Sequence, residues 1–314
     1  MLILVVLALA GLALLTFAAD QLVLGAGRLA TRLGIAPVVV GVVVIGLGTS
    51  TPEFVVSGLA AARGDAALAL GNLTGSNIIN VTLILGVVGL VAPIAVRSSV
   101  PRREAPLSVV AVALFAGFAL VGLGRIAGAV LAVATVAALV FLVRLARVGT
   151  RDPMPTQVDE FLDGAPEARV APETVRVVVG LAGTILGAQL LVSSAATAAH
   201  RVGVPPAVIG FTLVAFGTSL PELVTAVQAQ RRRSTDLLVG NLLGSNLVNS
   251  LAGGAIVGLL GRGGSARLGY PVLAAMVSVT LLTWLVLYRR YRVTRVEAVL
   301  LLLAYVLTLP LIGT

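Results

Sequence analysis

The chain has 314 residues, of which 58% belong to the hydrophobic class and 11% are charged, and its mean hydropathy is +1.09. Soluble domains are about 45–50% apolar and about 25% charged, so the composition excludes a soluble enzyme, a disordered chain and a fibrous repeat. The chain has no cysteine, which excludes disulfides and thiolate metal sites. The formal net charge is +9, and all 22 basic residues are arginines. They are scattered between apolar blocks, so we expect a lipid bilayer as the surroundings and no nucleic-acid partner.

Ten apolar blocks along the chain are each long enough to cross a bilayer, which requires about 20 residues. They begin near Leu2, Pro37, Ala66, Pro106, Ile126, Val175, Pro205, Leu237, Tyr270 and Glu297. The connections between them are short and carry most of the charge. The sequence therefore predicts an all-α membrane protein with ten transmembrane helices.

The arginines are divided unequally between the two sets of connections. The odd-numbered connections carry 17 arginines and the even-numbered connections carry 5. Cytoplasmic loops are enriched in basic residues, so this pattern predicts that both termini face outward. The use of arginine alone, with a bias toward Ala, Val, Leu and Gly, is typical of a GC-rich prokaryotic genome and favours the prokaryotic plasma membrane.

The longest connection divides the chain into two halves. Residues 150–173 contain several prolines and acidic residues and are too short to form a domain. A regulatory ion site there is an alternative, but a solvated acidic linker is the simpler interpretation. We expect a first five-helix repeat over residues 1–149, a cytoplasmic linker over 150–173 and a second five-helix repeat over 174–314.

The two halves share two sequence motifs at a constant offset of 169 residues. IAPVVVGVVVIGLGTSTPE at 35–53 matches VPPAVIGFTLVAFGTSLPE at 204–222, and GNLTGSNIIN at 71–80 matches GNLLGSNLVN at 240–249. Because each half holds an odd number of spans, the second half enters the membrane from the opposite side. This is an inverted-topology repeat, which is common among secondary transporters and places the site near the midplane.

The first motif predicts a break in a helix next to a buried acid. Pro52 and Pro221 lack an N–H group and disturb the preceding turn, so both helices should break at the midplane and line a polar cavity. Glu53 and Glu222 follow directly. An acid within an apolar span is costly and is usually functional. The alternative is a pair of permanently protonated glutamates that bond to the backbone.

The second motif adds polar groups at helical spacing. Ser76 and Asn80, like Ser245 and Asn249, are four residues apart and share a helix face. For Asn72, Asn77, Asn241 and Asn246 the sequence does not decide between ion binding and helix packing. The candidate side-chain donors are all hard oxygen ligands and come from Glu53, Glu222, Thr49, Thr218, Ser50, Ser219, Ser76, Ser245, Asn80 and Asn249. Such donors suit Ca2+ and disfavour Zn2+ or Cu+. Two carboxylates balance one Ca2+, two Na+ or two protons.

With these motifs the sequence resembles the cation/Ca2+ exchanger superfamily, and within it the Na+/Ca2+ exchanger branch of prokaryotic type. The two alpha repeats of that family resemble residues 38–90 and 207–259. The resemblance implies a secondary antiporter that exchanges Na+ for Ca2+ by alternating access, with no cofactor, no enzymatic activity and no obligate protein partner. Ca2+ and Na+ would be its bound substrates, and the first and sixth helices would slide as the gate.

The resemblance also assigns roles to residues. Glu53 and Glu222 would bind both Ca2+ and Na+, Thr49 and Thr218 would join them, and Ser50, Ser76, Ser219 and Ser245 would complete flanking Na+ sites. The carbonyls of Gly46 and Ala215 fall at family ligand positions.

One departure from the family pattern leaves the coupling ion and stoichiometry open. Asn249 stands where several sodium-using and potassium-dependent relatives carry Asp, which leaves K+ co-transport and the Na+ stoichiometry open. The proton-coupled branch typically has Asn-Ala where this chain has Thr-Ser, which favours Na+. An H+/Ca2+ antiporter of the same superfamily is the alternative.

Two other classes fit less well. A channel requires a continuous pore, whereas an inverted repeat with broken helices indicates alternating access. An intramembrane enzyme would require a catalytic motif, and the sequence offers neither HExxH nor a nucleotide loop.

Three further acids have simpler interpretations. Asp20 is predicted to be an interfacial residue near the inner end of the first span, and not an ion ligand. Asp65 and Asp236 stand at expected helix starts, where they should serve as caps.

Overall fold

The computed structural model describes residues 2–33, 46–98, 100–148, 169–261 and 267–313. The first half contains α1 (Leu2–Arg32), α3 (Gly46–Thr49), α4 (Thr51–Ala62), α5 (Ala66–Ile79), η2 (Asn80–Ile84), α6 (Leu85–Val91), β1 (Ile94–Ala95), α7 (Glu104–Val121) and α8 (Arg125–Val148). The second half contains α10 (Val170–Val202), α11 (Pro206–Ile209), η4 (Gly210–Val214), α12 (Ala215–Thr218), α13 (Leu220–Arg231), α14 (Thr235–Val248), η5 (Asn249–Gly253), α15 (Gly254–Leu260), α16 (Tyr270–Arg290), β2 (Arg292–Val293), α17 (Arg295–Thr308) and η6 (Leu309–Gly313).

The structure is a helical membrane protein. Within the described residues, eight helices are long and apolar enough to cross a membrane, or nine if the bent pair formed by residues 206–218 and 220–231 counts as one span. The predicted second span begins in residues 34–45, and most of the predicted linker falls in 149–168. Both segments lie outside the described residues, so the count of ten remains a prediction.

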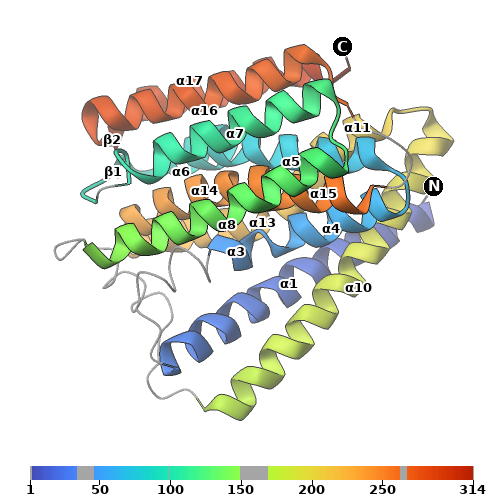
Figure 1. Ribbon diagram of the computed structural model, residues 1–314, viewed down its shortest axis with the longest axis horizontal. Coiled ribbons are helices and arrows are strands. Elements are labelled where there is room, and N and C mark those ends of the chain that lie inside the picture. Colours follow the sequence, from blue (N-terminus) through green and yellow to red (C-terminus); the bar gives the residue numbers. More distant parts are fainter. Residues whose placement is uncertain (1, 34–45, 99, 149–168, 262–266, 314) are drawn as a thin grey trace.

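Two long helical rods form the centre of the bundle. The first runs through α5, η2 and α6, and the second runs through α14, η5 and α15. In the most apolar stretch of each rod 78% of residues are buried, against 17–39% in the other spans. Helices α7, α16 and α17 pack on one side, α8 lies across the front of the central rods against α15, and α1 and α10 cross each other on the side opposite α17 (Figure 1). The central rods are therefore shielded from lipid.

Each central rod contains one π-helical turn at the same place in the repeat. The turns η2 and η5 begin at Asn80 and Asn249, which are 169 residues apart. A π turn interrupts the regular hydrogen-bond ladder and is frequent at functional sites. Near η2, the hydroxyl of Thr82 donates to the carbonyl of Ile78 at 2.5 Å, and that of Thr283 donates to the carbonyl of Val81 at 3.2 Å. These hydroxyls satisfy backbone groups that no water could reach.

Helices α1 and α10 pack against each other at backbone distance. A Cβ atom on Gly187 would lie 2.5 Å from the backbone nitrogen of Leu15 and 2.7 Å from the carbonyl oxygen of Gly11. Such a contact is possible only without a side chain. At one end of the pair, Glu173 of α10 forms ion pairs with Arg28 of α1 at 3.6 Å and with Arg176 at 3.2 Å. The two helices therefore form a closely packed pair beside the rest of the bundle.

A short two-stranded ladder joins the connections that follow α6 and α16. Strands β1 and β2 are antiparallel, with Ile94 opposite Val293 and Ala95 opposite Arg292. This ladder links the first half of the chain to the second at one end of the bundle.

The predicted caps have different outcomes. Asp65 caps α5 as predicted, because its carboxylate accepts the N–H of Leu68 at 3.1 Å. The prediction for Asp236 is wrong. Asp236 lies inside the first turn of α14, and its Oδ1 accepts the backbone N–H groups of Arg97 and Ser98 at 2.7 Å each. Asp236 thus holds the loop before α7, a long-range contact that local spacing does not reveal.

Candidate ion-binding site

Both GTSxPE motifs interrupt a helix, as the prolines predict. The chain leaves helical geometry at Ser50, with φ −83° and ψ 2°, and at Ser219, with φ −84° and ψ 6°. The segments on either side of Ser219 are bent by 40°. Pro52 and Pro221 stand near the start of the second segment, where a missing N–H costs little. Each break therefore presents a serine hydroxyl, followed by a glutamate in the first turn of the next helix.

The two glutamates are bound crosswise by hydroxyls from the opposite half of the chain. Ser219 donates to Oε1 of Glu53 at 3.1 Å, and Ser50 donates to Oε1 of Glu222 at 3.4 Å. Ser245 also donates to Oε1 of Glu222 at 3.4 Å. Both glutamate side chains are fully buried. The two breaks thus meet at one place, and each half completes the other's carboxylate site.

The threonines of the motifs are held by asparagines in the same crosswise manner. Thr49 donates to Oδ1 of Asn241 at 3.3 Å, and Thr218 donates to Oδ1 of Asn72 at 3.1 Å. The Oγ atoms of Ser245 and Ser76 lie 3.4 Å and 3.5 Å from the hydroxyls of Thr49 and Thr218, respectively. The two sets of contacts are related by the offset of the sequence repeat. The asparagines left undecided by the sequence thus include two partners of the site threonines.

The predicted amide ligands lie at the first residue of each π turn. Asn80 and Asn249 are both fully buried. Asn80 donates its amide to Oδ1 of Asn246 at 3.0 Å, while its own Oδ1 has no partner among the described residues. For Asn249, neither amide atom has a partner within the described part of the chain.

The centre contains acceptor oxygens that protein groups leave unused. The Oε2 atoms of Glu53 and Glu222 have no hydrogen-bond partner among the described residues. The ion pairs found in the described ranges involve Glu173 and reach neither of these carboxylates. In the described part of the chain, no three His, Cys, Asp or Glu side chains are placed so that they could hold a metal ion together. The arrangement therefore offers two carboxylates, hydroxyls and amide oxygens to a hard cation.

The two predicted carbonyl positions begin the short helices α3 and α12, which precede the breaks. Ala215 is buried at the start of α12, and its carbonyl accepts the N–H of Ser219 at 3.0 Å and the hydroxyl of Thr218 at 3.3 Å. Gly46 is the first residue of α3. All ten side chains predicted as ligands are buried.

One polar residue near the site was missed by the sequence analysis. Ser57 is fully buried, and its hydroxyl accepts the amide of Asn72 at 2.9 Å. The signal that could have found it is its position one turn after Glu53, on the same helix face. Its repeat counterpart is Ala226, and the Nδ2 of Asn241 has no partner among the described residues. The pseudo-symmetry of the site is therefore incomplete.

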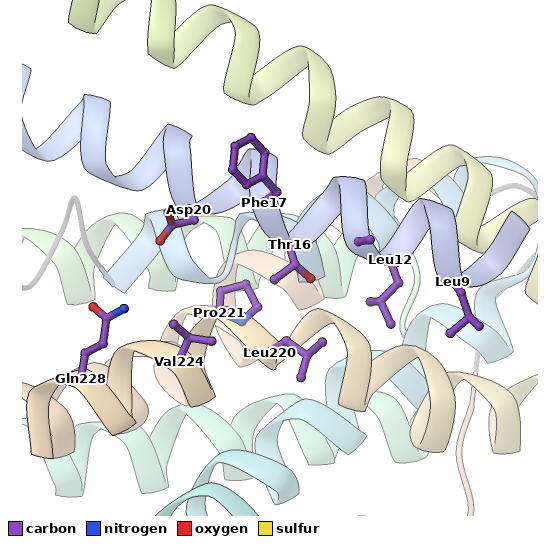
Figure 2. A pocket seen from close by; sticks show the side chains of 10 residues that line it. Leu9, Leu12, Thr16, Phe17, Asp20, Leu220, Pro221, Val224 and Gln228 are labelled. Atoms are coloured by element: carbon purple, nitrogen blue, oxygen red, sulfur yellow. The ribbon is translucent and has the colours of Figure 1, made fainter. Parts of the chain in front are cut away.

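A cavity of about 490 Å³ lies beside the second break, between α1 and α13 (Figure 2). Pro221, the residue before Glu222, lines this cavity together with Asp20 and Gln228. Asp20 is exposed and lies twelve residues before the end of α1. Its position on α1 borders the cavity next to the site. A second cavity, of about 190 Å³, is lined by Ser219. Both cavities therefore adjoin the second break.

Apolar spanning helices around a buried, oxygen-rich centre define a membrane protein of the ion-transporting class. The family model for sodium/calcium exchanger protein matches residues 3–146 and 173–312. The chain belongs to this family, whose members are membrane exchangers and not enzymes.

Individual relatives agree with the family match over nearly the whole chain. The putative antiporter CaxA of Alkalimonas amylolytica is 36% identical over 313 residues, which cover 98% of this chain and 97% of the relative. The sodium/calcium exchanger MaX1 of Methanosarcina acetivorans is 28% identical, with 94% of each chain covered. A structure of the sodium-calcium exchanger NCX_Mj, soaked with 2.5 mM Na+ and 1 mM Sr2+, matches with a TM-score of 0.70, 29% identity and 99% coverage of both chains. Fold and family together support exchange of Ca2+ for another cation.

Proposed function

We propose that this protein is a Na+/Ca2+ antiporter in which both ions compete for a central site formed around Glu53 and Glu222. The observation that carries the proposal is the pair of fully buried glutamates, each bound by a serine from the opposite half. Each also has one carboxylate oxygen without a hydrogen-bond partner among the described residues. A buried carboxylate without a cation is costly. A bound ion supplies the missing charge.

The donor set determines which ions can use the site. Ca2+ takes six to eight oxygen ligands, and the centre supplies carboxylate, hydroxyl and amide oxygens. One Ca2+ or two Na+ ions balance two carboxylates, so the two ions exclude one another by charge. Thr49, Thr218, Ser76 and Ser245 would line the ion positions, with the carbonyls of Gly46 and Ala215 nearby.

Alternating access would use the α1–α10 pair as the moving element. A Cβ atom on Gly217 would lie 2.5 Å from a methyl carbon of Leu12, so α1 lies directly over the second break. The cavity between α1 and α13 lies beside this contact, because Leu12 also lines the cavity. Sliding α1 along this face would expose the site on one side and cover it on the other, as in hinge and shear motions of packed helices.

The proposal includes the whole transmembrane arrangement. Ten helices form two inverted five-helix repeats over residues 1–149 and 174–314, joined by a cytoplasmic linker. Both termini face outward in a prokaryotic plasma membrane. The distribution of arginines and the crosswise contacts related by the repeat offset support this arrangement.

A proton-coupled Ca2+ antiporter is the second candidate. The free oxygens of the two buried carboxylates could each carry a proton in place of Na+. The hydroxyls of Thr49 and Thr218, which suit a dehydrated Na+ ion, support Na+ coupling instead.

Charge removal at the site tests the proposal directly. We expect Glu53→Gln or Glu222→Gln to reduce Na+-driven Ca2+ uptake into proteoliposomes to the level of empty vesicles, because each variant removes half of the fixed charge. Glu297→Gln is the matched control. Glu297 lies in the capping box of α17, where Gln also serves. Normal uptake by either site variant would contradict the assignment.

A further inference from the structure

We infer that Asn246 is a positioning residue that orients the amide of Asn80 so that its oxygen faces the ion. The inference rests on the proposed ion site and assigns a role to one of the asparagines that the sequence left undecided. Asn246 is fully buried in α14 and bonds to Asn80 of the other central rod.

The orientation follows from a short chain of hydrogen bonds. Asn246 donates its Nδ2 to the backbone carbonyl of Asn77 at 2.8 Å. A carbonyl can only accept, so the NH2 group of Asn246 must face Asn77 and its Oδ1 must face away. That Oδ1 accepts Nδ2 of Asn80 at 3.0 Å. Each amide in the chain is thereby fixed in one of its two possible orientations.

This chain of hydrogen bonds ends at the Oδ1 atom of Asn80. Oδ1 of Asn80 is buried and has no partner among the described residues. Asn80 lies one turn after Ser76, whose Oγ is 3.5 Å from the hydroxyl of Thr218. An amide in the reverse orientation would present its NH2 group there, and an NH2 group repels a cation. Asn246 therefore decides whether Asn80 can act as a hard oxygen ligand.

Among the described residues, the equivalent pair in the other half, Asn77 and Asn249, does not form this chain of hydrogen bonds. Asn77 is the repeat counterpart of Asn246, but its Nδ2 donates to the hydroxyl of Ser250 at 2.9 Å. The position equivalent to Ser250 in the first half is Val81, which has no hydroxyl to offer. Because Ser250 takes the amide of Asn77, Asn249 is left without a partner for either amide atom among the described residues.

Within the described part of the chain, the site consequently has one amide oxygen that hydrogen bonds fix and one amide that no hydrogen bond fixes. A pre-oriented oxygen favours the ion that gains most from an extra strong ligand, and Ca2+ carries twice the charge of Na+. The Asn246–Asn80 pair thus sets the preference for Ca2+, whereas Asn249 can adapt to either ion.

The first test is Asn246→Leu, which conserves size and removes both hydrogen bonds. Loss of a group that orients a metal ligand typically weakens metal affinity by about 10–100-fold. We expect the KM for Ca2+ in Na+-driven uptake to rise about tenfold or more, with a much smaller change in maximal rate. Asn246→Asp retains an acceptor for Nδ2 of Asn80, and it should raise KM less than Leu.

The control for general damage is Thr283→Val. Thr283 donates a buried hydrogen bond to the carbonyl of Val81 beside η2 but takes no part in the amide chain. The Thr283→Val variant should have a KM for Ca2+ close to that of the wild type.

A double variant separates orientation from structural support. A carboxylate presents oxygen in either orientation, so Asn80→Asp should restore Ca2+ affinity to Asn246→Leu by a larger factor than it improves the wild type. Equal factors in the two backgrounds would overturn the inference, as would an unchanged KM in Asn246→Leu.

A binding measurement keeps this result separate from the transport proposal. Ca2+-induced stabilisation of the purified protein against heat should be smaller in Asn246→Leu than in Thr283→Val. Wild-type protein that is stabilised by Ca2+ yet shows no exchange would contradict the proposed function, while the effect of Asn246→Leu on binding would still support the inference. Equal stabilisation of both variants would overturn it.

Discussion

At the residue scale, the candidate site depends on single hydroxyls and amides. Each of the two carboxylates receives a hydrogen bond from a serine in the opposite half of the chain. The bond from Ser219 to Glu53 and the bond from Ser50 to Glu222 join residues more than 160 positions apart. The motifs predicted these residue types and a site for a hard cation. They could not reveal the partners of the asparagines, because a helix face does not determine which helix lies opposite it.

The repeat also conceals differences that only the contacts reveal. Ser57 has no polar counterpart at Ala226, and Val81 has no hydroxyl to match Ser250. Each difference leaves one asparagine of the second half with an unpaired amide group among the described residues. The sequence predicts a symmetric site. Among the described residues, however, the amide of Asn80 has a hydrogen-bond partner and that of Asn249 has none.

The residue-scale prediction concerns Asn249→Asp. The buried amide has no described hydrogen bond to lose, and a bound cation or a proton can neutralise the new carboxylate, so we expect the variant to fold. A third carboxylate would demand more positive charge per cycle and would change the Na+ or K+ dependence of Ca2+ uptake. Reversal potentials of exchange in proteoliposomes measure this charge. Unchanged Na+ and K+ dependence would count against a role for this position.

At the scale of elements, the helix breaks could be predicted and the π turns could not. Proline spacing indicated the interruptions near Ser50 and Ser219. The turns at Asn80 and Asn249 leave no comparable signal, because no residue type prescribes them. The close packing of α1 on α10 also depends on which glycines face each other across the pair.

Gly187→Ala tests that packing. Its Cβ would fall 2.5 Å from the backbone nitrogen of Leu15, so the helices must separate, at a cost of about 1–3 kcal/mol. We expect a lower melting temperature in detergent and slower exchange, measured by circular dichroism and Ca2+ uptake. The control is Gly117→Ala in α7, where an added Cβ would meet no described atom within 4 Å. That variant should be as stable as the wild type or more so, since alanine favours helix over glycine. A melting temperature that is unaffected by Gly187→Ala would show that α1 and α10 are not held this closely.

At the scale of the whole molecule, the family and the helical membrane fold agree with expectations from the sequence. The motif residues are buried together, but their role as ion ligands stays a prediction. The segments 34–45 and 149–168 lie outside the described residues, so the ten-helix count and the linker remain predictions. The identity of the coupling ion depends on the energetics of occupied states, which neither composition nor repeat symmetry determines.

The central claim is that Na+ entry drives Ca2+ transport through the two-glutamate site. The most direct measurement is radioactive Ca2+ uptake into proteoliposomes preloaded with Na+, compared with matched vesicles that carry only a proton gradient or no gradient. We predict uptake with the outward Na+ gradient alone. Uptake driven equally by the proton gradient, or a leak that requires no gradient, would contradict it.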